Sequence, residues 1–390
     1  MSTFVAGGPS LPIASRGAVP PFHVMRVLAA AAARRATGAD VYDLSAGQPS
    51  TPAPGPVLAA ARQALARDRI GYTAPLGLPE LRAAIAGHYR RDYGLDIEAS
   101  SVVVTTGSSG GFLAAFLAAF DPGDAVVLPR PGYPAYRNML SALGCRVIEL
   151  PLAADFRLDV ALLETLDEVP AGVVLASPAN PTGSMVVAAE LAALVRWCDA
   201  HGVRLISDEI YHRITFGAAA ESAWQASRRP VVVNSFSKYF CMTGWRLGWL
   251  LSPPELLESI DRLVGNFALC PPTLSQHAAL AAFEAYDELD ANVARYRVNR
   301  DLMLERLAAM GVEQVAPADG AFYVYADMSR WTADSLDFAY RLLAETGVAV
   351  APGVDFDPVD GGRFIRMCFA GDTDRISNAM DVLGDWLTSV

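Results

Sequence analysis

One segment of the chain carries side chains suited to covalent chemistry. Ser235, Ser237 and Lys238 occur within four residues, and Arg246 follows eight residues after the lysine. Two hydroxyls and a guanidinium suit the oxygens of a phosphate dianion. A lysine beside that phosphate, in apolar surroundings, suits a nucleophile that forms a Schiff base. Arginine carries nearly all the positive charge of the chain, so this lysine stands out against the alternative of a surface lysine near an unrelated arginine.

A glycine- and serine-rich segment is a second candidate. Gly107, Ser108 and Ser109 begin the run GSSGG, which joins a predicted strand to a predicted helix. The free N–H groups and the dipole of a helix N-terminus attract anions. The run lacks both the GxxxxGKS/T pattern of a P-loop and the GxGxxG pattern of a dinucleotide-binding turn. Alone, it is equally compatible with an anion site and with a flexible connection.

Three further candidates lie at or just after apolar strands. Asp208 ends one strand, where a carboxylate is costly unless it meets a cation, although Asp is also a common helix N-cap. Tyr211 follows one helical turn later and could face the same ligand. Tyr133 follows a Pro-Gly pair and could stack on a planar ring or fill a turn.

The elements that must position these residues alternate between strands and helices. Continuous apolar strands separated by helices predict a mostly parallel sheet with helices on both faces, which is an α/β fold. Because ligands bind outside the carboxyl ends of the strands in such sheets, we expect the segments that follow the strands to converge on one pocket. The predicted strands are 102–105, 125–128, 146–150, 172–176, 203–207, 231–234 and 247–251.

The two ends of the chain predict a second, smaller α+β domain. Residues 24–35 have the pattern of a helix, and the last ~80 residues mix short strands with helices. We therefore expect residues 1–48 to form an N-terminal arm and part of the small domain, residues 49–285 the large domain, and residues 286–390 the rest of the small domain. The segment around Phe22 is a candidate lid over the pocket.

Composition excludes several classes of protein. The 390 residues are 52% hydrophobic, and 31 basic against 42 acidic residues give a net charge of −11, which argues against nucleic-acid and anionic-membrane partners. Five widely spaced cysteines without a CxxC pair predict neither a disulfide framework nor a metal site. No apolar stretch reaches membrane-spanning length, and the N-terminus lacks a signal-peptide pattern, so we expect a cytoplasmic protein.

Seven motifs resemble those of a known family. The run SFSKYFCMTGWRLGW (235–249) is similar to the lysine motif of the class I/II pyridoxal-phosphate aminotransferases, the fold type I enzymes of the aspartate aminotransferase superfamily. The resemblance covers nearly the whole chain and implies amino-group transfer from an L-amino acid to a 2-oxo acid by a ping-pong mechanism. The other motifs, in the order of the family, are LSAGQP (44–49), YTAPLGLPELR (72–82), PRPGYPAY (129–136), SPANPTG (177–183), SDEIY (207–211) and RFIRMCFA (363–370).

The resemblance implies catalytic roles for several of these residues. Lys238 would form a Schiff base with pyridoxal 5'-phosphate, and once substrate displaces it, the freed amine would move a proton between the substrate and the cofactor. Asp208 would pair with the pyridine nitrogen and keep it protonated, which makes the ring a better electron sink. Asn180 and Tyr211 would hydrogen-bond the phenolate oxygen of the cofactor. Tyr133 would stack on its ring.

The resemblance also implies where phosphate and substrate bind. Tyr72 would reach the phosphate of a neighbouring subunit, which implies a homodimer with shared active sites. Arg366 would bind the substrate α-carboxylate in a bidentate pair, with Asn180 and the backbone of Gly47 nearby. Arg363 is close in sequence, but the RxC order favours Arg366. The residues implied to hold the phosphate are Gly107, Ser108, Ser109, Ser235, Ser237 and Arg246.

The amino donor and the exact reaction stay open at this stage. Some aspartate-preferring relatives carry a lysine where Ser109 stands. The absence of that lysine disfavours aspartate as the donor, although Arg130 or Arg137 could supply a positive charge for a side-chain carboxylate from elsewhere. Alanine-like, branched, aromatic and basic donors are all compatible with the sequence. A lyase, cyclase or decarboxylase could use the same residues, because the pocket decides which bond breaks. A regulator that binds the cofactor without turnover is the remaining alternative.

Overall fold

A seven-stranded sheet forms the centre of the computed structural model, which describes residues 12–67 and 69–389. The strand order is β2-β8-β7-β6-β5-β3-β4, and β8 alone runs antiparallel to both of its neighbours. The predicted mostly parallel sheet is therefore confirmed. Its strands are β2 (Val102–Thr105), β3 (Ala125–Arg130), β4 (Arg146–Pro151), β5 (Gly172–Ala176), β6 (Arg204–Asp208), β7 (Val231–Ser235) and β8 (Gly248–Leu251).

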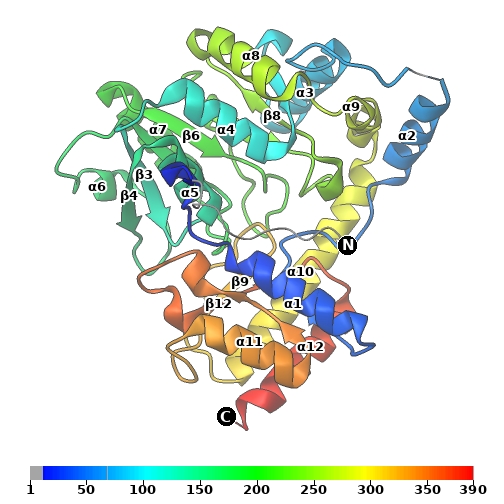
Figure 1. The fold of residues 1–390 in the computed structure, drawn as a ribbon, viewed down its shortest axis with the longest axis vertical. Helices are drawn as coiled ribbons and strands as arrows, with labels where there is room; N and C mark the ends of the chain where they lie inside the picture. The colour runs from blue at the N-terminus through cyan, green and yellow to red at the C-terminus, as the bar shows by residue number, and fades with distance from the viewer. Residues whose placement is uncertain (1–11, 68, 390) are drawn as a thin grey trace.

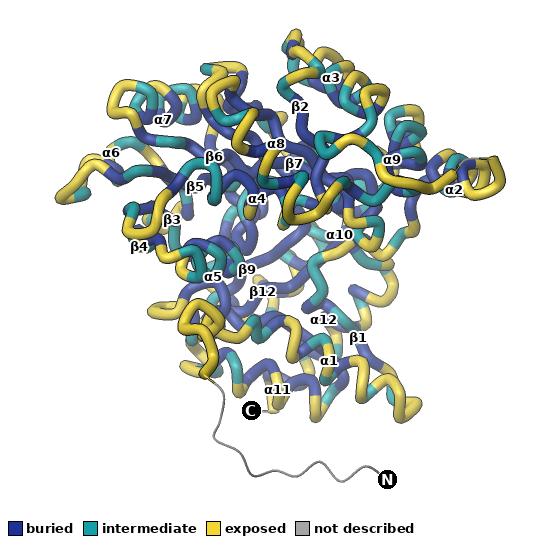
Figure 2. The backbone as a smooth tube through the Cα atoms, turned by 45° about the horizontal axis from the view of Figure 1, so that its top comes forward, coloured by how far each residue is buried: buried dark blue, intermediate teal, exposed yellow. Residues whose placement is uncertain are grey.

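Helices cover both faces of this sheet because its strands are apolar on both faces. Val103 and Val126 pack in one cluster with α4 (Gly107–Ala119), α5 (Pro134–Leu143) and α8 (Pro254–Ala268). Their neighbours Val102 and Val127 pack in the other cluster with α3 (Pro79–Tyr93) and α7 (Ala188–His201). Adjacent strand residues thus face opposite helix layers, as the two-residue period of a strand requires. Figure 2 shows the buried strands between the partly exposed helices.

Both ends of the chain build the second, smaller unit. Strand β1 (Tyr42–Asp43) pairs with β10 (Val348–Ala349), although about 300 residues separate them. A three-stranded antiparallel sheet contains β11 (Ala351–Pro352), β12 (Phe364–Cys368) and β9 (Tyr323–Asp327). The helices of this unit are α1 (His23–Ala36), α11 (Ser335–Thr346) and α12 (Thr373–Leu387).

The long helix α10 (Tyr286–Ala309) connects the two units. In Figure 1 it runs, in yellow, from the large sheet with its helices down to the small unit. Its start coincides with the predicted boundary between residues 285 and 286, but the domain boundaries themselves stay a prediction. The remaining helices of regular length are α2 (Gly55–Arg67) and α9 (Thr273–Ala279), with the one-turn α6 (Val160–Leu163).

Helix α4 begins earlier than the sequence pattern indicated. We expected a helix over 111–120, whereas α4 starts at Gly107, directly after β2. Glycines are poor helix formers, so helix propensity does not predict that α4 begins in the run GSSGG. Ser108 and Ser109 consequently lie in the first turn, where backbone N–H groups lack intrahelical acceptors.

The helices can be compared with the length and apolarity of a membrane-spanning segment. Over the ranges that the structure describes, none combines the length and the apolarity needed to cross a bilayer.

Candidate active site

The seven-stranded sheet and the small unit both contribute residues to a cavity of about 390 Å³. Most of the residues that the sequence singled out border it, although they come from loops more than 300 residues apart along the chain. They follow the carboxyl ends of strands of the large sheet or lie on the small unit. The sequence-predicted residues on its wall are Gly47, Ser108, Ser109, Tyr133, Asn180, Asp208, Tyr211, Ser237, Lys238, Arg246 and Arg366.

Three predicted residues do not line this cavity. Gly107 contacts the guanidinium of Arg246, which itself lines the cavity; a Cβ at Gly107 would lie 2.4 Å from Nη2 of that arginine. Ser235 is buried and lies beside the cavity residue Ser237, with 2.8 Å between the two hydroxyl oxygens. Tyr72 lies on the loop between α2 and α3 and is 85% exposed.

Lys238 is the only lysine in the 390 residues. Its Nζ donates a 2.7 Å hydrogen bond to the carbonyl oxygen of Gly47, at the edge of the cavity. Surrounding protein desolvates the ammonium group, and the charges of Arg366 and Arg246 also disfavour it. Cys368 and Asp208 oppose these influences, and the net result lowers the pKa of Lys238 to about 8. Near neutral pH more of the amine is therefore unprotonated than in an exposed lysine, which favours a nucleophile.

Asp208 lies at the carboxyl end of β6 and is buried. Its Oδ1 accepts a 3.0 Å hydrogen bond from the backbone N–H of Ile210, and its Oδ2 accepts one from the hydroxyl of Tyr136. Burial raises the pKa of Asp208 to about 6, and both hydrogen bonds counteract this rise. The carboxylate is consequently poised to meet a cation in the cavity.

Sequence reasoning missed Tyr136, which lies on α5 three residues after Tyr133. The ring centroids of the two tyrosines are 5.3 Å apart with an interplanar angle of 81°, so Tyr136 packs edge-on against Tyr133. The motif PRPGYPAY contains both aromatic residues. One turn of helix places them on the same face, which is the signal that could have identified Tyr136.

Arg366 lies on β12 and is 3% exposed. Its Nη1 donates a 2.9 Å hydrogen bond to Oδ1 of Asn180, and its Nη2 donates a 2.7 Å bond to the carbonyl oxygen of Ser45. Arg363, the alternative weighed from the sequence, has a half-exposed side chain that pairs with Asp327 at 3.4 Å. The structure therefore directs Arg366, and not Arg363, into the cavity.

Tyr323 is a second cavity residue that the sequence did not reveal. It lies on β9, and its hydroxyl oxygen is 2.7 Å from that of Tyr211. Its ring also lies 4.3 Å from the guanidinium carbon of Arg366. Along the chain it lies in the continuously apolar run AFYVYA (321–326), so its pattern is that of an ordinary core residue.

Apolar side chains from the start of the chain form one side of the cavity. Phe22, Val24, Met25 and Leu28, which we call the α1 wall, lie at or just before the first turns of α1. The carboxylate of Asp355 anchors this helix start by accepting hydrogen bonds from the N–H groups of residues 23 and 24, at 2.9 and 2.6 Å. The predicted lid segment around Phe22 thus borders the cavity.

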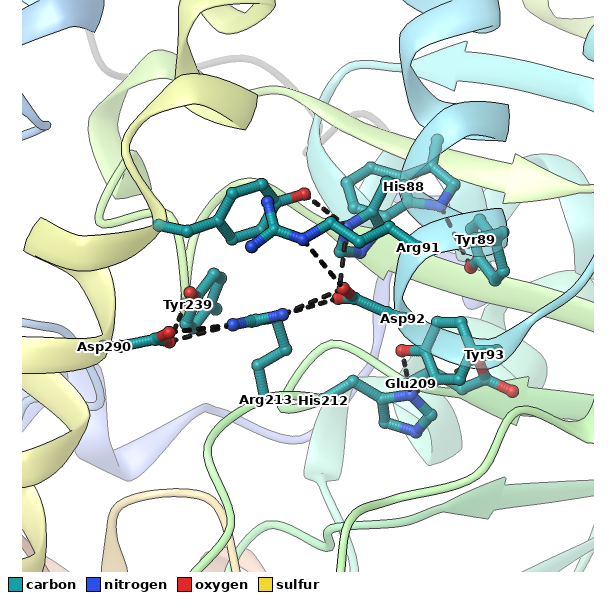
Figure 3. Close-up of polar contacts among 12 residues, drawn as sticks. His88, Tyr89, Arg91, Asp92, Tyr93, Glu209, His212, Arg213, Tyr239 and Asp290 are labelled. Atoms are coloured by element: carbon teal, nitrogen blue, oxygen red, sulfur yellow. Dashed lines mark hydrogen bonds and ion pairs between the residues drawn. The ribbon is translucent and has the colours of Figure 1, made fainter.

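Figure 3 shows a network of charged and polar residues that includes Tyr239, the neighbour of Lys238. Nη1 of Arg213 donates to both carboxylate oxygens of Asp92 on α3, each at 2.9 Å. Nη2 donates to both oxygens of Asp290 on α10, each at 3.0 Å. Tyr239 donates a 2.6 Å hydrogen bond to Asp290 on α10. Through Asp290 and Arg213, the segment that carries Lys238 is therefore linked to α10 and α3.

Two buried titratable groups adjoin this network without adding net charge. Burial raises the pKa of Glu209 to about 8 and lowers the pKa of His212 to about 3, so both are neutral at neutral pH. Nε2 of His212 lies 3.0 Å from the carbonyl oxygen of Ser177, and its Nδ1 lies 2.7 Å from the hydroxyl of Tyr93. Asp208 therefore remains the carboxylate that faces the cavity.

Comparison with known proteins gives consistent matches along the chain. A family profile described as aminotransferase class I and II matches residues 39–383. The valine–pyruvate aminotransferase of Mycobacterium tuberculosis is 55% identical, over 97% of this chain and 99% of that protein. A crystal structure of an aminotransferase from Mycobacterium tuberculosis has a TM-score of 0.95 at 55% identity, covering 98% of this chain and 100% of that one. An aspartate aminotransferase from Thermus thermophilus, solved with maleate, has a TM-score of 0.90 at 33% identity, covering 96% and 100%.

Proposed function

Because the chain belongs to aminotransferase class I and II, its reaction is the transfer of an amino group, and we propose that the donor is an L-amino acid with a short aliphatic side chain. The acceptor is a small 2-oxo acid, and the cofactor is pyridoxal 5'-phosphate held at Lys238. The observation that carries the cofactor proposal is the single lysine of the chain, which borders a cavity together with a carboxylate and two arginines. The enzyme acts in the cytoplasm.

The residues around the cavity fit the phosphate group of this cofactor. Arg246, Ser235 and Ser237 lie close together with the first turn of α4, so guanidinium, hydroxyl and N–H donors surround one small space. A Cβ at Gly107 would lie 2.4 Å from Nη2 of Arg246, so glycine leaves room for this guanidinium beside the first turn of α4. Donors of this kind at a helix N-terminus suit a dianion. Ser108 and Ser109 would contribute their backbone N–H groups.

The other functional groups of pyridoxal phosphate also find partners. Asp208 would hold a proton on the pyridine nitrogen, because a buried carboxylate stabilises a cation beside it. Tyr133 would stack on the ring, and Asn180 and Tyr211 would donate hydrogen bonds to the phenolate oxygen. All four side chains border the same cavity.

Lys238 would both attach the cofactor and move a proton. Bound pyridoxal phosphate would supply a carbonyl carbon for Nζ to attack and a ring that accepts the electron pair left when the substrate Cα–H bond breaks. Once the amino group of the donor has displaced Lys238 from the cofactor, the freed Nζ would take the proton from the donor Cα as a general base. A pKa of about 8 for Lys238 suits that task, because more of the amine is free near neutral pH than in an exposed lysine and it is still basic.

Arg366 would orient the substrate by its α-carboxylate. Asn180 and Ser45 fix its two Nη atoms, and Nε has no hydrogen-bond partner among the described residues. A planar guanidinium can bind a carboxylate through two parallel hydrogen bonds, which a lysine cannot do. Gly47 would bring its backbone close to the same carboxylate.

The α1 wall supports a short aliphatic donor. These four side chains, with Met139 on α5, are apolar and lie on the cavity that would hold the donor side chain. The relative named valine–pyruvate aminotransferase makes valine the first donor and pyruvate the first acceptor to test. Among the described residues, the charged side chains on the wall of the cavity are Asp208, Lys238, Arg246 and Arg366, and each already has a task above.

We propose that the active enzyme is a homodimer in which Tyr72 reaches the phosphate site of the other subunit. Tyr72 is 85% exposed, and Ile70, Phe267 and Leu269 are also exposed nearby in the fold. The loop that carries Tyr72 contacts the segment after α8, because the Oγ1 of Thr273 donates to the carbonyl oxygen at position 71. An exposed apolar cluster of this kind suits a second copy of the chain.

A half-reaction experiment tests this function. Protein reconstituted with pyridoxal phosphate is mixed with L-valine, L-alanine or L-aspartate without an acceptor, and the visible absorbance is recorded. We expect valine and alanine to discharge the absorbance with one equivalent of 2-oxo acid per site, and pyruvate to restore it. Aspartate should react more slowly. Continuous product release without an acceptor would instead indicate a lyase or decarboxylase.

A further inference from the structure

We propose that Tyr323 is a positioning residue that sets two tasks of the site through two separate parts of its side chain. Its hydroxyl would tune the cofactor contact of Tyr211, and its ring would orient Arg366 for the substrate carboxylate. This inference rests on the proposed function, and it adds a residue from the small sheet to the working site.

The hydroxyl contact links the two units of the fold. Tyr323 lies on β9 of the small sheet, whereas Tyr211 follows β6 of the large sheet, and their hydroxyl oxygens are 2.7 Å apart. Both rings are buried, and both tyrosines border the cavity. If Tyr211 donates its hydrogen to a cofactor oxygen, Tyr323 must be the donor between the two hydroxyls. Tyr323 then polarises Tyr211 and makes it a stronger donor.

The ring contact fixes the plane of Arg366. The register pairs Tyr323 with Cys368, so Arg366 is a diagonal neighbour on the same face of the small sheet. The guanidinium carbon lies 4.3 Å from the ring centroid of Tyr323 and 4.8 Å from that of Phe356. Arg366 thus lies between two aromatic rings, and cation–π attraction stabilises it there.

The glycine at position 47 leaves the space that the Tyr323 hydroxyl occupies. A Cβ at Gly47 would lie 2.2 Å from that hydroxyl oxygen. The carbonyl oxygen of Gly47 in turn accepts the hydrogen bond of Lys238. Tyr323 therefore touches the residues that hold the lysine, the phenolate contact and the carboxylate contact.

Three variants separate the two tasks. Tyr323→Phe removes the hydroxyl and keeps the ring, Phe356→Leu removes the other ring beside Arg366, and Tyr323→Leu removes both features of Tyr323. Two readouts are taken on resting protein loaded with pyridoxal phosphate. One is the pH midpoint at which its visible absorbance changes, and the other is the dissociation constant of 3-methylbutanoate, which is valine without its amino group.

We expect Tyr323→Phe to raise the pH midpoint by roughly half a unit to one unit, because a weaker Tyr211 donor leaves more electron density to hold the proton on the Lys238 nitrogen. Its affinity for 3-methylbutanoate should change less than about twofold. Phe356→Leu should weaken that affinity about 3- to 30-fold and leave the midpoint unchanged. Tyr323→Leu should show both effects.

Two results would overturn this assignment. One is a Tyr323→Phe midpoint equal to that of the unaltered protein, and the other is an affinity loss in Tyr323→Phe as large as in Tyr323→Leu. Thermal unfolding of each variant shows whether it is folded. If the unaltered protein gains no visible absorbance when it is loaded with pyridoxal phosphate, the proposed cofactor is wrong, which is a different outcome from a failure of Tyr323.

Discussion

The Nζ of Lys238 lies 2.7 Å from the carbonyl oxygen of Gly47, so the loop after β1 closes directly on the lysine of the large sheet. A side chain at position 47 would collide with the hydroxyl of Tyr323. Glycine at this position therefore permits three parts of the chain to meet at the amine. The carbonyl holds the resting lysine without a counter-charge, which leaves burial as the largest influence on its pKa.

The pKa of Lys238 can be measured directly, because the chain contains a single lysine. Protein labelled with ¹³C at the lysine Cε and freed of cofactor should give one side-chain resonance. We expect it to titrate near pH 8, because burial disfavours the ammonium form; below that pH the amine is protonated. The variant Arg366→Met should raise this midpoint, since the arginine charge lowers it. A midpoint near the ordinary value of 10.5 would contradict the buried setting.

Replacing Asp208 should slow the chemical step more than it weakens cofactor binding. Asp208→Asn keeps the shape of the side chain but removes the negative charge that would hold a proton on the pyridine nitrogen. We expect the single-turnover rate with L-valine to fall about 10²- to 10³-fold. The rate is read from the decay of visible absorbance, and a fall of less than tenfold would mean that the nitrogen has another partner.

Tyr136→Phe gives the matched control for this experiment. It removes the hydroxyl that donates to Oδ2 of Asp208 and leaves the carboxylate in place. Because that hydrogen bond lowers the pKa of Asp208, its loss should move the pKa upward from about 6. Activity should then begin to decline at a higher pH on the acid side, while the rate at high pH changes little. An unchanged acid limb would mean that Asp208 does not set it.

Local sequence was sufficient for most of the site and for the large sheet. The β-branched run at β5 was predicted with its observed bounds, because a continuous apolar strand between helices has few other interpretations. Lys238, Arg246 and Asp208 could be identified because polar residues next to buried strands are unusual and need a purpose. Their convergence followed from the rule that ligands meet the carboxyl ends of parallel strands.

Two aromatic residues of the site, Tyr136 and Tyr323, could not be identified in this way. Tyr323 contacts Tyr211 across 112 residues of sequence, and Tyr136 contacts Asp208 across 72. A tyrosine on an apolar face has the same pattern whether its hydroxyl meets water, backbone or a catalytic side chain. Arg213 was missed for the same reason, because its partners Asp92 and Asp290 lie on two helices whose relative placement only the tertiary fold provides.

Mixing two impaired variants should test the shared active site. Lys238→Ala keeps Tyr72, and Tyr72→Ala keeps Lys238. In a hybrid dimer, one site combines both defects and the other site has neither. We expect the mixture, after unfolding and refolding together, to regain about a quarter of the unaltered activity per chain, as random pairing predicts. Mixing without refolding is the control. If the activity only equals the average of the two parents, Tyr72 acts within its own subunit or not at all.

Arg213 should contribute strongly to stability because the carboxylate of Asp92 would be a buried, unpaired charge without it. The side chain of Asp92 is 7% exposed, and Arg213 bonds both of its oxygens. Arg213→Met should lower the free energy of unfolding by about 3 kcal/mol, at the lower end of the range for removing one partner of a buried ion pair. Urea unfolding, followed by far-ultraviolet circular dichroism, measures this loss.

Arg204→Met is the matched control, because the Arg204 side chain is 20% exposed against 22% for Arg213, but its partner Glu255 is 52% exposed. Its loss should be less than about 1 kcal/mol, since water can solvate the released carboxylate. Adding Asp92→Asn to Arg213→Met should recover part of the stability, because the unpaired buried charge is then gone. Equal losses for the two arginine variants, or no recovery in the double variant, would mean that the charge of Asp92 is not what Arg213 compensates.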